Sequence, residues 1–135
     1  MTIVIDASVA VKWVLPENGS EAASSLLSEE LIAPTFWLLE AASVLWRRQR
    51  RGEMSVDQAG ARLLGLINAP VAPVPIEPHI ERSLKLAAEL DHPVYDCLYL
   101  AIAIKHDTHV VTADRRFAAV ADRESLAGLV RLLGT

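Results

Sequence analysis

Four carboxylates in this sequence lie where apolar residues or strand ends are expected. Asp96 interrupts the apolar stretch HPVYDCLYLAIA, and Glu40 interrupts FWLLEAASVLW. Asp6 ends the run TIVID, and Asp114 follows HVVTA. A charged side chain in an apolar setting is costly to desolvate unless it has a hydrogen-bond donor, a cation or a chemical task. These four acids are therefore the candidates for chemistry.

The pattern of apolar residues predicts the elements that would hold these acids. Strands are predicted at residues 2–5, 31–34, 109–113 and 129–133, with an edge strand in the proline-rich segment at 70–78. Helices are predicted at about 8–15, 17–30, 35–51, 55–67, 78–90, 95–106 and 114–121. Thr35 is expected to cap the third helix and Gly52 to end it, while Ser55 and Gln58 form a capping-box pattern. Strands that alternate with helices predict one α/β domain over residues 1–135, with a parallel sheet covered on both faces.

A parallel sheet would bring the four acids to one edge. Ligands of open α/β sheets bind beyond the carboxyl ends of the strands. Asp6 and Asp114 each follow a strand, and Glu40 lies in the first turns of the helix that leaves the same edge. The helix with Asp96 leads into the strand at 109–113 and spans roughly 18 Å, so it begins back at the carboxyl edge. All four side chains are therefore expected to converge.

Helix capping is the simplest alternative explanation for the three aspartates. It does not explain Glu40, which lies inside its helix, or why four acids should share one edge. Carboxylates so placed would repel and raise one another's pKa values. A cation removes the conflict, and oxygen ligands select hard ions such as Mg²⁺ or Mn²⁺. Such a site suits phosphodiester hydrolysis, because the ion activates water and neutralises charge on phosphate oxygens.

The composition excludes some classes of protein but does not identify the function. The chain has 135 residues, 52% of them hydrophobic, which allows one sizeable core. No apolar run approaches the roughly 18–20 residues of a membrane span, and the chain enters TIVID directly after Met1, so no signal peptide is expected. Cys97 is the only cysteine, in keeping with a cytoplasmic protein. The net charge of −4 does not exclude a nucleic acid, because setting the four acids aside leaves acids and bases equal in number.

The sequence around the four acids resembles the PIN-domain ribonucleases, specifically the VapC toxins of bacterial toxin–antitoxin pairs. The resemblance rests on VIDASV at Asp6, LLEAASVL at Glu40, VYDCLYLAIA at Asp96 and VTADRRF at Asp114, in this order over nearly the whole chain. It implies a three-layer α/β/α sandwich and a Mg²⁺- or Mn²⁺-dependent endoribonuclease acting on RNA. It also implies a homodimer that is inhibited by a small cognate VapB-like antitoxin.

The resemblance assigns roles within a catalytic site made of the four acids. Asp6 and Asp96 match the family's principal metal ligands. Glu40 and Asp114 match the remaining acids, which would bind directly or through water. The hydroxyl residues Ser8 and Thr112 match small positions that would support the ligands.

Arginines near the predicted site are candidates for RNA contact. Some family members carry a further acid shortly after the last aspartate, where this chain has Arg115 and Arg116, so one tightly bound ion is expected rather than two. These two arginines are the better candidates for phosphate contact, because they adjoin Asp114. Arg47 and Arg50 are weaker candidates, since arginines at a helix end can equally complement the helix dipole.

The histidines and tryptophans are assigned no catalytic role. His79, His92, His106 and His109 show no metal-ligand spacing and are expected on the surface. Trp13, Trp37 and Trp46 are expected to pack in the core or at an interface, with Trp13 and Trp46 as candidate linings of an antitoxin groove.

Two alternatives to the toxin remain open at this level. A PIN nuclease that processes RNA, or one that acts on DNA, would share all four acids. A receiver-like, metal-binding signalling domain is the alternative from another class, but receivers need paired acids after the first strand and a lysine near the last. Here Asp6 is single and no lysine ends a predicted strand, so a nuclease is favoured.

Overall fold

The structure of the chain is a computed structural model that describes residues 1–135 except for the side chain of Glu124. A sheet of five strands among the described residues runs through its centre, and each pair of neighbouring strands is parallel. The strands are β1 (Thr2–Ile5), β2 (Glu30–Pro34), β3 (Val71–Val74), β4 (Val110–Thr112) and β5 (Val130–Leu132), in the order β3-β2-β1-β4-β5. The predicted edge strand is confirmed as β3, where Pro73 lacks an N–H that a central strand would need.

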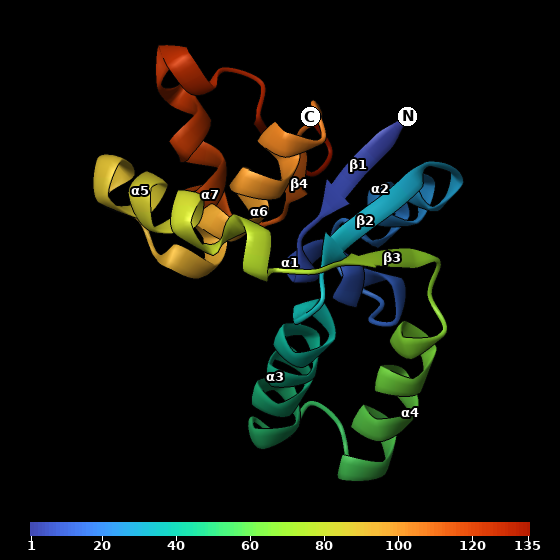
Figure 1. Cartoon of the computed structure of the whole chain (residues 1–135). Coiled ribbons are helices and arrows are strands. Elements are labelled where there is room, and N and C mark those ends of the chain that lie inside the picture. The colour runs from blue at the N-terminus through green and yellow to red at the C-terminus, as the bar shows by residue number, and fades with distance from the viewer.

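Helices cover both faces of this sheet (Figure 1). They are α1 (Ala7–Ala10), α2 (Ser20–Ser25), α3 (Trp37–Arg50), α4 (Val56–Ile67), α5 (Ile80–Leu90), α6 (Val94–Lys105) and α7 (Arg115–Ala118). Side chains alternate along the strands, so Ile3 and Ile5 pack with α1 to α4, whereas Val4 packs with α5, α6 and α7. The predicted three-layer α/β/α sandwich is therefore confirmed. In the described part of the chain, each helix is too short or too polar to cross a bilayer.

The two-sided core explains the apolar sequence of α6. Its residues from Cys97 to Ala103 are all buried, because α6 lies against β1, β2 and β4 on one side and α5 on the other. A helix that is apolar all round is buried all round. This packing fixes the place where the first turn of α6, with Asp96, emerges from the core.

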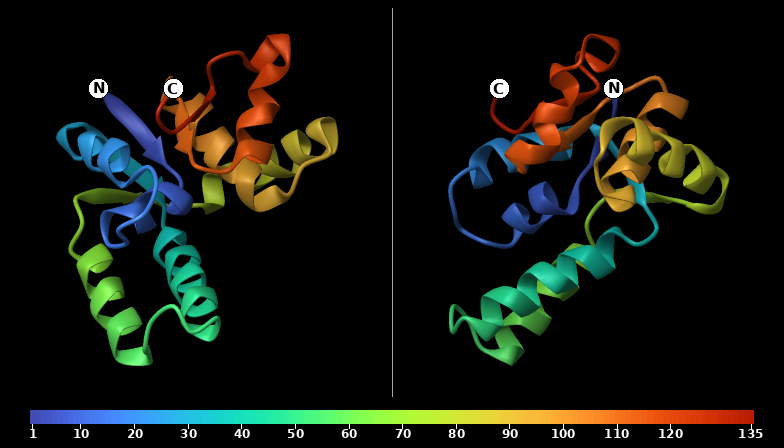
Figure 2. Two further views of the ribbon diagram at one scale, coloured as in Figure 1. Left: turned by 180° about the vertical axis from the view of Figure 1, so that it is seen from behind. Right: turned by 90° about the vertical axis from the view of Figure 1, so that its left-hand side faces the viewer.

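The helices α3 and α4 form an arm that extends away from the sheet (Figure 2). The capping box predicted at the start of α4 is confirmed: Ser55 Oγ accepts from the N–H of Gln58, and the Gln58 side chain accepts from the N–H of Ser55. Gly52 follows α3 with a φ of 81°, as a terminating glycine does. The cap predicted at Thr35 is wrong, because α3 begins one residue later, with Phe36 at its N-cap position and no side-chain cap. Thr35 instead donates its backbone N–H to Val74 O at 3.0 Å, which prolongs the pairing of β2 with β3.

The second helix is shorter than predicted. Gly19 has a φ of 90°, a left-handed conformation that a helix cannot include, so α2 begins at Ser20 rather than Glu17. The first helix also changes character, since α1 gives way to a 3₁₀ turn over Val11–Trp13. Neither change moves the strand ends that carry the candidate acids.

The burial of α6 can be tested by substitution of Leu100, which is fully buried. We expect Leu100→Ala to lower the free energy of unfolding by about 2–5 kcal/mol, because it leaves a cavity in a packed layer. Leu64→Ala on α4 is the matched control: this leucine is 59% exposed, and its loss should change the free energy by about 0.5 kcal/mol or less. Urea unfolding followed by circular dichroism measures both. Equal effects of the two substitutions would contradict this packing.

Candidate active site

Asp6 is buried directly after β1. Its N–H donates to Val111 O at 3.1 Å, which continues the pairing of β1 with β4. Its Oδ2 accepts hydrogen bonds from Thr112 Oγ1 at 2.6 Å and from Ser8 Oγ at 3.0 Å. Burial raises the pKa of Asp6, the two hydroxyls oppose that rise, and the charge of Asp96 adds to it. Oδ1 is the oxygen that these hydroxyls leave available.

Glu40 reaches the same region from the first turn of α3. Its Oε1 accepts a hydrogen bond from the hydroxyl of Tyr99, at 2.5 Å. Tyr99 is fully buried on α6, and burial together with the neighbouring carboxylates raises its pKa, so the phenol stays protonated and donates. Burial raises the pKa of Glu40 to about 7; the Tyr99 hydrogen bond opposes this, and the charges of Asp6 and Asp96 add to it.

Asp96 lies in the first turn of α6. The N-cap position of this helix belongs to Pro93, so Asp96 is inside the helix rather than capping it. Its Oδ2 is 2.7 Å from Nε2 of His92. Burial raises the pKa of Asp96, His92 opposes the rise, and the charge of Asp114 adds to it.

Asp114 is the exposed member of the group. It caps α7, since its Oδ1 accepts from the N–H of Arg116 at 2.9 Å. Its own N–H donates to Thr112 Oγ1 at 3.0 Å, so Thr112 joins Asp114 to Asp6. Capping, the simpler explanation, therefore holds for Asp114 but leaves the other three acids unexplained.

The four acids form a chain of interacting charges where β1 and β4 end. Asp6 and Asp96 each raise the pKa of Glu40, Asp96 raises that of Asp6, and Asp114 raises that of Asp96. In the part of the chain that the structure describes, the acids, histidines and cysteine nevertheless do not form a close group of three that could hold a metal ion as they are. Like charges repel at short range, and one oxygen of each buried acid is turned toward a side-chain donor.

Among the described residues, no lysine or arginine neutralises the buried acids. Among the residues that the structure describes, none of the four acids forms an ion pair with lysine or arginine. Glu17 shows the contrast: burial would raise its pKa, but Arg48 Nη1 at 2.8 Å and Lys12 Nζ at 3.1 Å hold it below the usual value. The acid group thus keeps its negative charge without a lysine or arginine counter-charge in the described part of the chain.

The histidines differ from the surface positions predicted for them. His79 and His109 are only 8% and 6% exposed, and burial lowers the pKa of both rings. Neutral imidazoles can be buried once their polar atoms are accommodated, which composition alone does not reveal. His92 contacts Asp96, and the spacing of four residues was the one sequence signal for that contact. His106 is exposed, as predicted.

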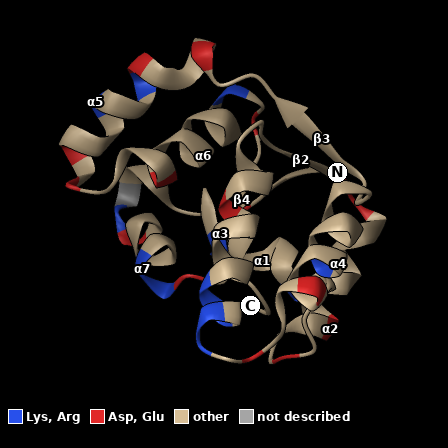
Figure 3. Ribbon diagram, turned by 90° about the horizontal axis from the view of Figure 1, so that it is seen from below, with Lys and Arg blue, Asp and Glu red and all other residues tan. Residues whose placement is uncertain are grey.

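The arginines predicted to contact RNA fall into two sets (Figure 3). Arg115 and Arg116 are exposed at the start of α7, next to Asp114. Arg47 donates to Ser43 Oγ at 3.1 Å, and the guanidinium of Arg50 lies 5.3 Å from the ring centre of Trp46. These two lie toward the far end of α3, roughly 10–15 Å along the helix from Glu40.

The predicted packing of the tryptophans is confirmed for two of them. Trp37 is buried, and Trp13 is half-buried with its indole N–H donating to Ala23 O at 2.8 Å. Trp46 is 53% exposed in a groove between α3 and α4.

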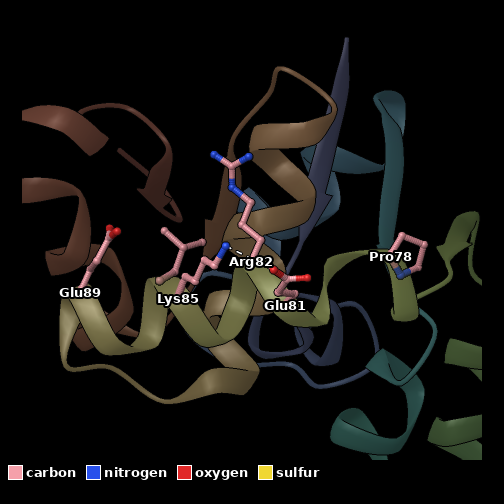
Figure 4. A pocket seen from close by; sticks show the side chains of 6 residues that line it. Pro78, Glu81, Arg82, Lys85 and Glu89 are labelled. Atoms are coloured by element: carbon pink, nitrogen blue, oxygen red, sulfur yellow. Dashed lines mark ion pairs between the residues drawn. The ribbon is translucent and has the colours of Figure 1, made fainter.

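One hollow adjoins the site and another lies along α5. An apolar groove of about 590 Å³ runs past Glu40 and includes Phe36, Leu39 and Tyr95. A second hollow of about 480 Å³ follows the outer side of α5 (Figure 4). Two acidic and two basic side chains line it, Glu81, Glu89, Arg82 and Lys85, and Lys85 pairs with Glu81 at 3.3 Å. Its mixed charge separates it from the acid group, where carboxylates alone gather.

Comparison with known proteins identifies the class of this fold and site. The PIN domain matches residues 3–123, and the chain therefore belongs to the PIN-domain family. Within that family it is 32% identical over 125 residues to ribonuclease VapC3 of Pyrobaculum aerophilum, which covers 87% of this chain and 93% of that protein. The predicted resemblance to the VapC proteins is thus confirmed.

Solved structures share the fold at lower sequence identity. PAE2754 of Pyrobaculum aerophilum superposes with a TM-score of 0.75 at 20% identity, covering 97% of this chain and 83% of that one. A toxin–antitoxin complex from Klebsiella pneumoniae gives a TM-score of 0.64 at 17% identity, covering 87% and 90% of the two chains.

The raised pKa of Glu40 predicts a pH dependence of stability in metal-free buffer. An acid with a pKa of about 7 in the folded chain and an ordinary value of 4.5 binds its proton more tightly when folded. The free energy of unfolding should therefore fall as the pH rises from about 4.5 to about 7. Glu40→Gln cannot ionise and should show a shallower fall, measured by urea unfolding at a series of pH values in chelator.

A matched control is Glu81→Gln on α5, because the Glu81 side chain is 84% exposed. In this variant the free energy of unfolding should fall with pH as steeply as in the wild type. The prediction fails if Glu40→Gln and the wild type lose stability in parallel over this range.

Proposed function

We propose that the chain is a VapC-type ribonuclease that hydrolyses RNA phosphodiester bonds with a bound Mg²⁺ or Mn²⁺ ion. The observation that carries the proposal is the group of carboxylates at the ends of β1 and β4. Burial raises the pKa of Asp6, Glu40 and Asp96, and among the described residues no lysine or arginine pairs with them. Membership of the PIN-domain family and the likeness to ribonuclease VapC3 support the reaction class.

The chemistry of the donors fits a hard divalent ion. Asp6 and Asp96 would be the principal ligands, and Glu40 and Asp114 would bind directly or through water, all through oxygen. The nearby thiol does not offer a soft alternative: burial raises the pKa of Cys97 to about 11, and its Sγ lies 3.7 Å from His92 O. A carboxylate group that is destabilised by burial and mutual repulsion gains most from a cation.

The residues of the chain orient the reaction. A bound ion of this kind supplies an activated water and neutralises charge on the phosphate. Ser8 and Thr112 hold Oδ2 of Asp6, which leaves Oδ1 for binding. Tyr99 holds Oε1 of Glu40, which leaves Oε2 to accept the proton of the attacking water.

The RNA would lie across the exposed rim of the site. Arg115 and Arg116 are exposed beside Asp114, where their guanidinium groups would contact phosphates that flank the scissile bond. Arg47 and Arg50 are secondary candidates, because they lie further along α3 and contact side chains of their own helix.

A VapB-like antitoxin and a second copy of the chain are the partners we propose. One of the similar folds is in a toxin–antitoxin complex. Trp46, exposed in the α3–α4 groove, is the better candidate for the antitoxin surface. Trp13 is half-buried, and its indole N–H already donates to Ala23 O. Leu39 and Tyr95, 74% and 68% exposed, offer an apolar surface for the homodimer. A cytoplasmic location stays a prediction.

The role of Asp96 gives the direct test of this function. Asp96→Asn keeps the side-chain shape but removes a charge, so RNA cleavage in Mg²⁺ or Mn²⁺ should fall by about 100-fold or more while circular dichroism stays unchanged. Asp107→Asn is the matched control at the other end of α6; Asp107 has a φ of 52°, which asparagine also tolerates. Cleavage of labelled RNA measures all three proteins. Equal rates for the wild type and Asp96→Asn would refute the proposal.

Expression without an antitoxin separates the toxin from the other nuclease functions. Growth of a bacterial host should stop on induction of the wild type and continue on induction of Asp96→Asn. Cleavage of RNA in vitro without growth arrest would favour an RNA-processing nuclease, and faster cleavage of DNA than of RNA would favour a DNA-directed one. Sequencing of RNA ends soon after induction would identify the target.

A further inference from the structure

The ring of His92 is held against Asp96 in a half-buried position. Nε2 lies 2.7 Å from Asp96 Oδ2, and the His92 side chain is 14% exposed. An ionised carboxylate can only accept a hydrogen bond, so the ring donates through Nε2–H. Asp96 itself is 27% exposed, and its carboxylate could turn to water if this donor were absent.

His92 is fixed on its other sides as well. The backbone N–H of His92 donates to Ala87 O at 3.3 Å near the end of α5. Its backbone carbonyl accepts from the Cys97 thiol at 3.7 Å. Its ring stacks on Phe117, with 5.7 Å between ring centres and 22° between the planes. Phe117 is 1% exposed in α7, the helix that Asp114 caps. The stack on Phe117 restricts tilting of the ring away from Asp96.

The same arrangement recurs at each of the three partly buried acids. One oxygen of Asp6 is held by Thr112 and Ser8, and one oxygen of Glu40 is held by Tyr99. His92 is the corresponding donor for Asp96. Donors behind a ligand fix the direction in which its free oxygen points, and their loss typically weakens metal binding or activity 10- to 100-fold.

We propose that His92 is a positioning residue for Asp96: its Nε2–H holds Oδ2, so that Oδ1 stays directed toward the acid group. Its stack on Phe117 ties this direction to α7. The inference rests on the proposed function, in which Asp96 is a ligand of the divalent ion.

Two substitutions separate the hydrogen bond from the packing. Both His92→Gln and His92→Asn remove the stacked ring. The glutamine amide nitrogen lies as many bonds from Cα as Nε2 and can still reach Asp96, whereas the asparagine amide matches Nδ1 and is too short. His92→Asn should weaken Mn²⁺ binding in calorimetry about tenfold or more and lower kcat for RNA cleavage similarly, with little change in KM. His92→Gln should retain most of both.

The controls keep the outcome clear. If His92→Asn folds poorly, His92→Leu takes its place. Leucine fills the apolar contact without a donor, so this variant should show the loss of Mn²⁺ binding and kcat that is expected of His92→Asn. His106→Asn, at the exposed far end of α6, should behave as the wild type. If His92→Gln and His92→Asn lose Mn²⁺ binding and kcat equally, only the packing of the His92 ring matters. If His92→Asn behaves as the wild type, His92 does not position Asp96. Either result overturns the inference.

The proposed function fails by a different result. If the wild type neither binds Mn²⁺ nor cleaves RNA, or if Asp96→Asn binds Mn²⁺ as the wild type does, the metal-dependent site and the role of His92 are both overturned. If the wild type is active and Asp96→Asn is inert, the site stands, and the His92 variants alone decide the positioning role.

Discussion

The burial of carboxylates at the end of one parallel sheet, to which their mutual repulsion adds, is the constraint on which this structure depends. Asp6, Glu40 and Asp96 are partly or fully buried, and each has a pKa above its usual value. The chain does not neutralise them as it neutralises Glu17, with a lysine and an arginine. It gives each one a neutral or weakly basic donor instead, which orients an oxygen and leaves the negative charge in place.

Rigid packing makes this arrangement sustainable. The donors Tyr99 and Thr112 are fully buried, Tyr99 on α6 between the sheet and α5, and Thr112 on β4 within the sheet. An unbroken apolar surface around α6 resists the rotation that would let Asp96 and Glu40 move apart. The stability lost by burying charges is thus offset by the sandwich around them, which holds the acids in the arrangement proposed to bind a cation.

Much of this geometry follows from the sequence, because topology determines which ends of the elements meet. Alternating strands and helices predict a parallel sheet, and residues that follow its strands or begin its helices must meet at one edge. The capping box at Ser55 and the edge strand at 71–74 were predictable for a different reason, since each depends on residues close in sequence.

Contacts between distant residues were beyond sequence reasoning. The ring of His92 stacks on Phe117, a contact that joins the segment before α6 to α7 and that no local sequence pattern encodes. Thr35 has the residue type of a helix cap, but its backbone continues the pairing with β3, and Phe36 takes the N-cap position of α3. The burial of His79 and His109 likewise comes from packing rather than from local pattern. Tertiary contacts override local preference at these positions.

The most direct measurement of the central claim is anomalous diffraction from crystals of the wild type grown with Mn²⁺. The account predicts one strong anomalous peak at the carboxyl ends of β1 and β4, coordinated by oxygens of Asp6 and Asp96. Peaks confined to other parts of the molecule, or a site coordinated by histidine nitrogens in place of these carboxylates, would contradict it.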